Sequence, residues 1–291
     1  MRKSHEKLYE SMCEEVMMMF LLILLLCLLF SAALYFYLIM PRVFGKPDTS
    51  SYRKWLYAHR GLFDNGSEAP ENSLEAFRKA VEGGFGIEMD VQLSRDGIPV
   101  VFHDFTLKRI CGVEGKVCDY TCDELQEFRL CGSGQRIPRF QEALELVDGK
   151  VPLIVELKLA TMDTSVCTEA DRLLSKYKGM YCIESFHPLA VRWYRKHRRE
   201  IVRGQLSDAF LKEGKFNRPV CFLLQNLLFN WMGKPDFVAY NHKYPKGFSR
   251  RFCRRIYHNT AVAWTIKTPG ELEAAKKYFD ICIFDSFVPE K

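Results

Sequence analysis

The chain has 291 residues, of which 48% are apolar and 27% are charged, a globular composition that excludes a mostly disordered protein. The net charge of +6 is small for a dedicated nucleic-acid-binding protein, so we expect no nucleic-acid partner. Eleven cysteines are too few for a disulfide-built scaffold in a chain of this length. The length fits one large α/β barrel with an additional segment.

An apolar segment follows the polar N-terminal residues 1–15. Residues 16–40 include no charged side chain, and a helix of this length, at 1.5 Å per residue, exceeds a hydrocarbon core of ~30 Å. We predict one transmembrane helix over 16–40 and a linker over 41–51. A cleaved signal peptide is the alternative, but its apolar region normally spans roughly 7–15 residues and precedes a small-residue cleavage site.

The side of the membrane is predicted from the cysteines. Cations flank the apolar segment on both sides, so the positive-inside rule does not decide its orientation. Nine cysteines follow the segment, an odd number without paired spacing, which is typical of free thiols in a reducing compartment. We therefore expect a single-pass anchor in the cell membrane, with the following domain on the cytoplasmic side.

Short apolar runs alternate with longer amphipathic runs over residues 52–291. The short runs are predicted strands and most of the longer ones are predicted helices, which together indicate a parallel sheet. About eight such units predict a TIM (β/α)8-type barrel for this domain. The predicted strands are 55–58, 85–93, 98–102, 152–157, 181–185, 201–205, 237–240, 261–265 and 281–284.

Two of these predicted strands form a hairpin rather than a crossover unit. Only residues 94–97 separate them, too few for a helix, so the two strands must be antiparallel. A register that pairs Leu93 with Ile98 places Glu88 opposite His103. The predicted hairpin thereby brings a carboxylate and an imidazole together.

Two carboxylates share one face of the strand over 85–93. Glu88 and Asp90 alternate with apolar residues, which in a barrel face the covering helices. The acids then point toward the barrel interior or mouth, where repulsion and desolvation are costly unless a cation lies between them. Glu156, beside Lys158 at the end of 152–157, can complete an oxygen ligand set for Mg²⁺ or Ca²⁺. The alternatives are a solvent-facing strand and a surface Glu–Lys pair.

The first predicted strand ends in His59, Arg60 and Gly61. The guanidinium fork of arginine suits a phosphate, and glycine permits a close backbone approach. His59 and His103 both lie at strand ends beside acids, which makes them a candidate acid–base pair. Lys158 can hold an anionic substrate oxygen.

In this order the motifs resemble those of the glycerophosphodiester phosphodiesterase family, here a membrane-anchored bacterial-type member. The resemblance covers about Trp55 to Val288, and the apolar segment lies outside it. Ser73 stands where threonine is common, a departure that affects neither the acids nor the histidines. The matching motifs are His59-Arg60-Gly61, Pro70-Glu71-Asn72-Ser73, Glu88-Met89-Asp90-Val91, Asp96-Gly97, Val101-Phe102-His103-Asp104, Glu156-Leu157-Lys158, Ser185-Phe186, Gly204-Gln205-Leu206-Ser207, Trp264-Thr265 and Phe284-Asp285.

The resemblance implies a modified TIM barrel with a divalent cation that cleaves glycerophosphodiesters to glycerol 3-phosphate and an alcohol. His59 would act as general base on water or on the glycerol 2-hydroxyl, and His103 as general acid on the leaving alcohol. Arg60 and Lys158 would bind the phosphodiester. The implied cation ligands are Glu88, Asp90 and Glu156.

Three further residues receive a role from the resemblance, each beside a structural alternative. Glu71 would contact the metal or its ligands, although Pro-Glu-Asn-Ser is also typical of a helix start. Phe186 and Trp264 would line the substrate pocket, whereas core packing explains each of them alone.

Two other functions remain open. A lysophospholipase D-type activity on lysophospholipids is the first, because an anchor brings the barrel to membrane lipid. A non-catalytic membrane-anchored binding module is the second, and the presence of both histidines and all three acids argues against it. The basic stretches 192–199 and 250–255 are either solvated faces or contacts to lipid, and 222–232 is a core helix or a membrane-touching one.

Overall fold

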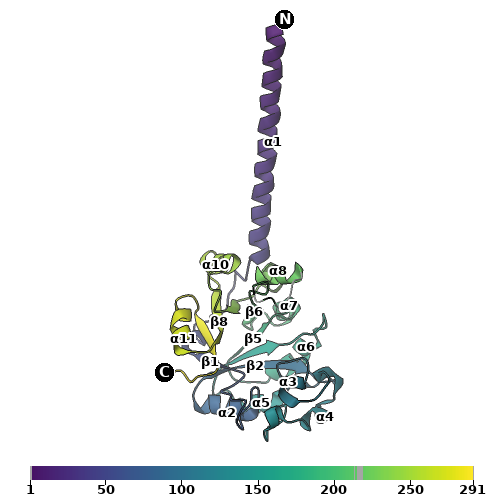
Figure 1. Cartoon of the computed structure of the whole chain (residues 1–291), viewed down its shortest axis with the longest axis vertical. Coiled ribbons are helices and arrows are strands. Elements are labelled where there is room, and N and C mark those ends of the chain that lie inside the picture. The colour runs from purple at the N-terminus through teal and green to yellow at the C-terminus, as the bar shows by residue number, and fades with distance from the viewer. Residues whose placement is uncertain (1, 213, 215–218, 291) are drawn as a thin grey trace.

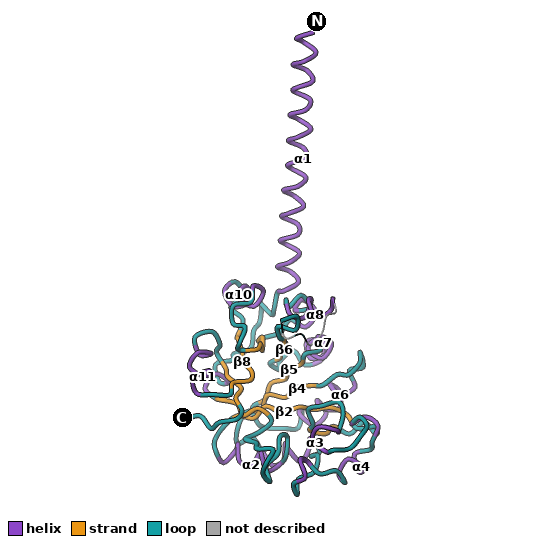
Figure 2. The backbone as a smooth tube through the Cα atoms, in the orientation of Figure 1, coloured by secondary structure: helices purple, strands orange, loops and turns teal. Residues whose placement is uncertain are grey.

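Eight parallel strands close into a barrel in this computed structural model, which describes residues 2–212, 214 and 219–290 (Figures 1 and 2). The order β1-β9-β8-β7-β6-β5-β4-β2 closes through pairing of β1 with β2, and β3 adds antiparallel to β2. The predicted TIM-type barrel with an antiparallel irregularity is confirmed. The strands are β1 (Leu56–His59), β2 (Gly86–Leu93), β3 (Pro99–Val101), β4 (Leu153–Leu157), β5 (Tyr181–Ser185), β6 (Arg203–Ser207), β7 (Phe237–Asn241), β8 (Thr260–Ile266) and β9 (Ile281–Phe284).

Helices surround the strands in Figure 2, and one long helix extends away from the barrel. The α2 helix shows how the sequence sets its bounds. The Ser73 hydroxyl caps it by accepting a hydrogen bond from the Ala76 amide at 3.0 Å. The helices are α1 (Arg2–Ile39), α2 (Leu74–Glu82), α3 (Lys108–Cys111), α4 (Cys122–Gln126), α5 (Phe140–Val147), α6 (Ser165–Leu174), α7 (Pro188–His197), α8 (Pro219–Gln225), α9 (Asn230–Gly233), α10 (Phe248–Arg255) and α11 (Pro269–Lys276).

The β2–β3 hairpin has a different register from the predicted one. Leu93 pairs with Pro99 rather than with Ile98, because Ser94 and Ile98 instead close a three-residue turn. Gly97 adopts a left-handed φ of +77° in this turn, and the Ser94 hydroxyl accepts a hydrogen bond from the Ile98 amide. The shift by one residue means that Glu88 and His103 are not cross-strand partners.

The apolar residues of β2 face outward, as predicted. Ile87, Met89 and Val91 belong to the hydrophobic layer between the sheet and the helices, which also includes Phe77 of α2 and Phe140 of α5. The alternate residues of the strand therefore face the barrel interior. Burying the apolar face of β2 outside thus places its two acids inside.

The segment 222–232, predicted as a core helix or a membrane-touching one, is instead divided between two helices. Leu227 has a φ of +59°, which ends α8 before α9 begins. Phe222 of α8 is 51% exposed, whereas Leu227 is buried. The prediction of a single buried helix was wrong because the apolar composition of this segment serves an exposed surface as well as the core.

The α1 helix docks on the barrel through its last turn (Figure 1). Ile39 is fully buried in the core, and its carbonyl accepts a hydrogen bond from the Asn230 side-chain amide at 3.0 Å. The Tyr35 hydroxyl lies 2.8 Å from the Ser249 hydroxyl of α10. The following segment is also bonded to the barrel, because the Arg42 amide donates to the Pro235 carbonyl at 3.0 Å. Helix and barrel are therefore joined by packed contacts.

We expect Ile39→Ala to destabilise the barrel by about 2–5 kcal/mol, because the substitution leaves a cavity in a fully buried position. Thermal or chemical unfolding of the full chain in detergent measures the effect. Ile23→Ala in the same helix is the matched control, since Ile23 is 52% exposed. Equal stabilities of the two variants would contradict the docking of α1 on the barrel.

Candidate active site

Three buried carboxylates meet inside the barrel at the carboxyl ends of neighbouring strands. Glu88 and Asp90 come from β2, and Glu156 comes from the adjacent β4, where it pairs in register with Asp90. Ligand oxygens of the three side chains all lie within 4.8 Å of one another. Parallel pairing of β2 with β4 thus brings Glu156 next to Glu88 and Asp90, although the two strands are far apart in the sequence. We refer to these three carboxylates as the acidic group.

The electrostatics of the three acids depend on burial. Burial, with repulsion from Asp90 and Glu156, raises the pKa of Glu88 well above its ordinary value. Burial also raises the pKa of Glu156, although Lys158 opposes this effect. Burial acts on Asp90 in the same direction, but Lys158, His103 and Arg60 outweigh it and hold the pKa of Asp90 low.

Two cations contact this acidic group. The Lys158 Nζ lies 3.0 Å from Glu156 and 3.3 Å from Asp90, and its side chain is 8% exposed. The Arg60 Nε lies 3.4 Å from Asp90, and the Arg60 amide donates to Glu88 at 3.1 Å. Both residues predicted to bind the phosphodiester therefore lie beside the predicted metal ligands.

A tight turn after β1 positions Arg60. Its φ of +55° and the φ of +82° at Gly61 are left-handed, and a Cβ at Gly61 would lie 2.8 Å from the Ala76 backbone of α2. Glycine is therefore required for the turn to approach α2. The turn directs the Arg60 amide toward Glu88 and its guanidinium toward Asp90.

Each of the two predicted catalytic histidines is held by a carboxylate. The His59 Nδ1 lies 3.0 Å from Asp285 at the end of β9, and its Nε2 lies 4.0 Å from Glu88. The His103 Nδ1 lies 2.5 Å from Asp104. In both imidazoles the Nδ1 is engaged, which leaves Nε2 for a reacting group.

Glu71 does not belong to the acidic group and instead binds two arginines. Its carboxylate accepts from Arg60 at 2.7 Å and takes both terminal nitrogens of Arg109 at 2.8 Å. The side chain of Asn65 donates to it as well, at 3.0 Å. Of the predicted roles, contact with a neighbour of the acidic group, Arg60, agrees with this geometry better than metal ligation, and Ser73 rather than Glu71 caps α2.

These contacts predict a pH-dependent contribution of Glu71 to stability. Burial opposes ionisation, but Arg109 and Arg60 lower its pKa from 4.5 to about 2. Because the folded-state pKa lies below the unfolded one, the stabilisation is complete above pH 4.5 and is lost as the pH falls toward 2. The lowered pKa of Glu71 corresponds to roughly 3 kcal/mol of stabilisation at neutral pH.

We therefore expect Glu71→Gln to destabilise the full chain by roughly 3 kcal/mol at pH 7 and by clearly less near pH 3. Unfolding in detergent at the two pH values measures the difference, with the exposed Glu82→Gln as control. A deficit of equal size at both pH values would contradict the role of the Glu71 charge.

Sequence reasoning assigned no role to several residues at this site. Asp104, Asp285 and Arg109 orient the histidines and Glu71, and Asn72 donates to Asp90 at 2.9 Å. Glu184 of β5 is buried beside Glu156 in the sheet register. The roles of two of these residues could have been inferred from the sequence, because Asp104 follows His103 directly and Asp285 follows the last predicted strand. Arg109 belongs to none of the matching motifs, which concealed its role.

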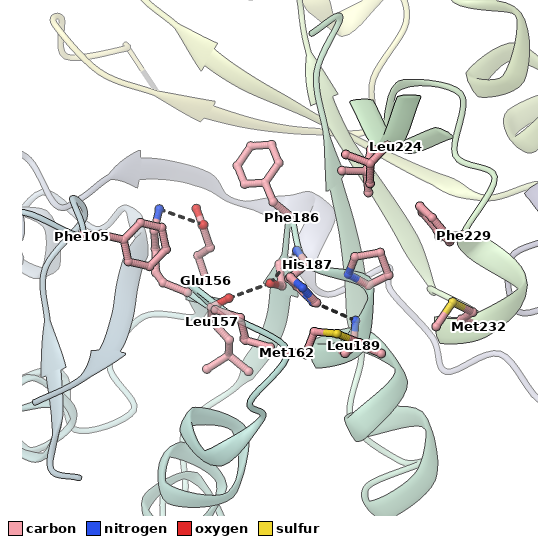
Figure 3. Close-up of a pocket in the computed structure, with 15 residues that line it drawn as sticks. Phe105, Glu156, Leu157, Met162, Phe186, His187, Leu189, Leu224, Phe229 and Met232 are labelled. Atoms are coloured by element: carbon pink, nitrogen blue, oxygen red, sulfur yellow. Dashed lines mark hydrogen bonds and ion pairs between the residues drawn. The ribbon is translucent and has the colours of Figure 1, made fainter. Parts of the chain in front are cut away.

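An apolar groove begins at the acidic group (Figure 3). It has a volume of about 460 Å³ and includes Glu156 and Lys158 at one end. Phe186 lies between this end and a wall formed by residues of α8 and α9. The Phe186 ring packs edge to face against the Trp264 ring, with ring centroids 5.5 Å apart. The wall consists of Val220, Leu224, Phe229 and Met232.

The donor set of the acidic group fits a hard divalent cation. Three carboxylates are oxygen ligands of the type that Mg²⁺ and Ca²⁺ prefer. The raised pKa of Glu88 shows that the two cationic side chains do not compensate the buried negative charge completely. A dication among Glu88, Asp90 and Glu156 would complete that compensation.

Comparison with known proteins identifies the family. The sequence profile of the glycerophosphoryl diester phosphodiesterase family matches residues 59–284. The chain belongs to this family. It is 34% identical over 272 residues to glycerophosphodiester phosphodiesterase 1 of Mus musculus, a match that covers 80% of this chain and 76% of that relative. A glycerophosphodiester phosphodiesterase of Caldanaerobacter subterraneus is 42% identical over 109 residues, which cover 35% of this chain and 44% of that relative.

A solved structure shares the fold. It is an Oleispira antarctica phosphodiesterase in complex with the product sn-glycerol-3-phosphate, with a TM-score of 0.64 and 23% identity. The similarity covers 80% of this chain and 92% of that one. The family match makes this protein a glycerophosphodiester phosphodiesterase, a phosphoric diester hydrolase. The enzyme class predicted from the sequence is therefore confirmed, and the expected substrate is a small molecule.

Proposed function

We propose that this phosphodiesterase releases glycerol 3-phosphate and an alcohol by acid–base catalysis with His59 and His103, using Mg²⁺ or Ca²⁺ at the acidic group. The observation that carries the proposal is the arrangement of the two imidazoles. Each has its Nδ1 bound to a carboxylate, that of Asp285 or that of Asp104. The His59 Nε2 also lies 4.0 Å from Glu88, and His103 helps to lower the pKa of Asp90. His59 ends β1, and His103 follows β3 beside the carboxyl end of β2, the end of the barrel at which folds of this type hold their substrates.

His59 is the general base in this proposal. Burial and the neighbouring Arg60 lower the pKa of His59, which keeps its imidazole neutral and able to accept a proton. Its Nε2 takes the proton from water or from the glycerol 2-hydroxyl, and the second route passes through a cyclic phosphate. His103 donates a proton from Nε2 to the leaving alcohol.

Arg60 and Lys158 hold the phosphodiester beside the acids. Their charged groups already lie within 3.4 Å of Asp90, so phosphate oxygens placed there meet two cations. A bound divalent cation supplies polarisation of the phosphoryl oxygen and offsets charge in the transition state. Phe186 and Trp264 flank the position as an apolar wall for the carbon part of the substrate.

The products formed from glycerophosphocholine test this assignment. The full chain in detergent should release glycerol 3-phosphate and choline in equal amounts, measured by separate coupled assays. Release of phosphocholine and glycerol would mean that the other phosphoester bond breaks. That result would overturn the proposed position of the leaving alcohol next to His103.

We further propose that α1 anchors the protein in the cell membrane through the predicted span 16–40, of which residues 16–34 cross the hydrocarbon core and the last residues dock on the barrel (52–291) on the cytoplasmic side. Residues Ser11–Ile39 of the helix form a candidate membrane span by length and hydropathy, and the uncharged part from Val16 onward is long enough to cross a bilayer. Signal-peptide cleavage near its end would remove Ile39 from the barrel core, so the packing supports retention of the helix. All eleven cysteines are unpaired, which supports a reducing compartment.

The apolar groove favours lysophospholipids as a second class of substrate. One end lies at Glu156 and Lys158, and the other reaches Met232 of α9. Trp231 of α9 stacks on Tyr37 of α1, with ring centroids 6.2 Å apart, so this end lies beside the anchor. A single acyl chain can therefore extend from the phosphate position toward the membrane.

The groove is tested by comparing kcat/KM for lysophosphatidylcholine and glycerophosphocholine. Val220→Asp should lower kcat/KM for the lysolipid at least about tenfold, because it places a charge on the apolar wall. Its kcat/KM for glycerophosphocholine should not change. Ile256→Asp, at a residue that is similarly exposed but outside the groove, is the control. Equal losses on both substrates would contradict an acyl-chain site.

A further inference from the structure

A second pocket lies where the long helix meets the barrel, remote from the acidic group. It has a volume of about 600 Å³ and begins at Met40, immediately after α1. Apolar residues of the following segment form one side of it, and Phe44 there is 91% exposed. The lining also includes five cationic side chains, of which Arg42 comes from the same segment and the others from the barrel: Arg42, Arg195, Arg199, Arg203 and Lys234.

The positive charge of this pocket is poorly compensated. Asp236 is the one carboxylate in the described part of the chain that forms an ion pair with any of these five cations, at 3.5 Å from Arg42 and 3.8 Å from Arg203. Burial and then Arg195 lower the pKa of Lys234 to about 8. Burial likewise lowers the pKa of Arg203; Asp236 opposes this shift, and the neighbouring Arg42, Arg195 and Arg199 add to it. An anion in the pocket would relieve this repulsion.

Backbone carbonyls fix two of the guanidinium groups. Arg195 donates to the carbonyls of Trp231 and Met232 at 2.9 and 2.8 Å, and Arg203 donates to that of Gly233 at 3.0 Å. All three carbonyls belong to α9, which contacts α1. The cations are therefore positioned before any ligand binds, unlike lysines on a flexible surface.

The pocket lies at the depth of lipid headgroups when α1 spans a bilayer. The uncharged part of α1 that the barrel leaves uncovered, residues 16–34, is roughly 28 Å long, close to a hydrocarbon core of ~30 Å. Tyr35 is the first partly covered residue. The Lys234 Nζ lies over the Tyr37 ring at 5.2 Å and donates to the Met40 carbonyl at 3.3 Å. In Figure 1 the barrel begins at this level.

We propose that this pocket binds the phosphate headgroup of an anionic phospholipid from the leaflet that surrounds the end of α1. The five cations neutralise the phosphate, and Phe44 contacts the apolar part of the same lipid. The proposal rests on the membrane anchoring proposed above but not on the catalytic assignment, since none of the five cations contacts the acidic group. Bound lipid would fix the orientation of the barrel on the membrane.

Thermal unfolding of the full chain in detergent with EDTA tests this binding. Phosphatidylglycerol should raise Tm in a saturable way, whereas phosphatidylcholine and inorganic phosphate at the same concentrations should not. Arg199→Gln combined with Lys234→Gln should raise the apparent Kd for phosphatidylglycerol at least tenfold. The control pair Lys176→Gln and Lys178→Gln, on a different face of the barrel, should leave it unchanged.

Each other outcome overturns the proposal. A Tm that does not depend on phosphatidylglycerol would mean that no headgroup binds. Equal weakening by the control pair would show diffuse attraction to a basic protein, and equal stabilisation by inorganic phosphate would show a site for the free anion. Glycerophosphocholine hydrolysis by the pocket variants, measured with metal restored, shows that they are folded.

Discussion

Alanine in place of His59 or His103 should lower kcat on glycerophosphocholine by at least about 100-fold, because each substitution removes one proton transfer. The two imidazoles are presented by different elements, His59 by the end of β1 and His103 by the chain just after β3. The contacts of the two imidazoles are with carboxylates, those of Asp285 and Glu88 for His59 and that of Asp104 for His103, so alanine removes polar contacts. The variants should therefore remain folded.

His197→Ala is the matched control for these variants, because His197 is an exposed histidine at the end of α7 whose Nδ1 contacts only a local backbone carbonyl. It should retain wild-type kcat. Asp285→Asn should lower kcat less than His59→Ala does, since the imidazole remains but loses its orienting carboxylate. Near-wild-type turnover by both histidine variants would refute the acid–base assignment.

Glu88→Gln should abolish activity and yet stabilise the metal-free protein. The pKa of Glu88 is raised by burial and by its acidic neighbours, so its ionised form is destabilising at neutral pH. Glutamine removes that charge and keeps an oxygen that can accept the Arg60 amide. The substitution also removes a cation ligand, so kcat should fall at least 100-fold, as is typical for loss of a catalytic metal contact.

Three measurements separate these effects. EDTA should eliminate wild-type activity, and Mg²⁺ or Ca²⁺ should restore it. Added metal should raise the Tm of the wild type but not that of Glu88→Gln. Glu82→Gln, which changes an exposed glutamate of α2, should behave like the wild type. Full activity of the wild type in EDTA would contradict a metal at the acidic group, and a lower metal-free Tm of Glu88→Gln would contradict the electrostatic argument.

Much of the fold could be predicted because it depends on local patterns. Alternation along β2 was sufficient to place Ile87, Met89 and Val91 outside and the acids inside, since only one face of the strand can pack against helices. The register of the β2–β3 hairpin was not predictable in the same way. It depends on the left-handed Gly97 and on the Ser94 hydroxyl. The turn between β2 and β3 is one residue longer than the predicted turn, which shifts every cross-strand pair by one position.

The site was harder to predict wherever one side chain acts through another. Glu71 and Arg60 lie in two different motifs, and the second partner of Glu71, Arg109, lies 38 positions away and belongs to no recognised pattern. The division of 222–232 into α8 and α9 was also hidden, because an apolar run has the same composition in a core and on an exposed wall. In both cases tertiary contacts, rather than local sequence, decide the role.

With α1 inserted in the membrane as proposed, the packed junction between α1 and the barrel would limit where the enzyme can work. Because Ile39 is buried and Arg42 is bonded to Pro235, no loose tether separates the two parts. A flexible tether would let the active site sample many heights above the bilayer, whereas a helix packed rigidly on the barrel would hold the active site at a single height. Molecules that diffuse within the plane of the leaflet then meet the active site at high effective concentration, and molecules free in solution gain no such advantage.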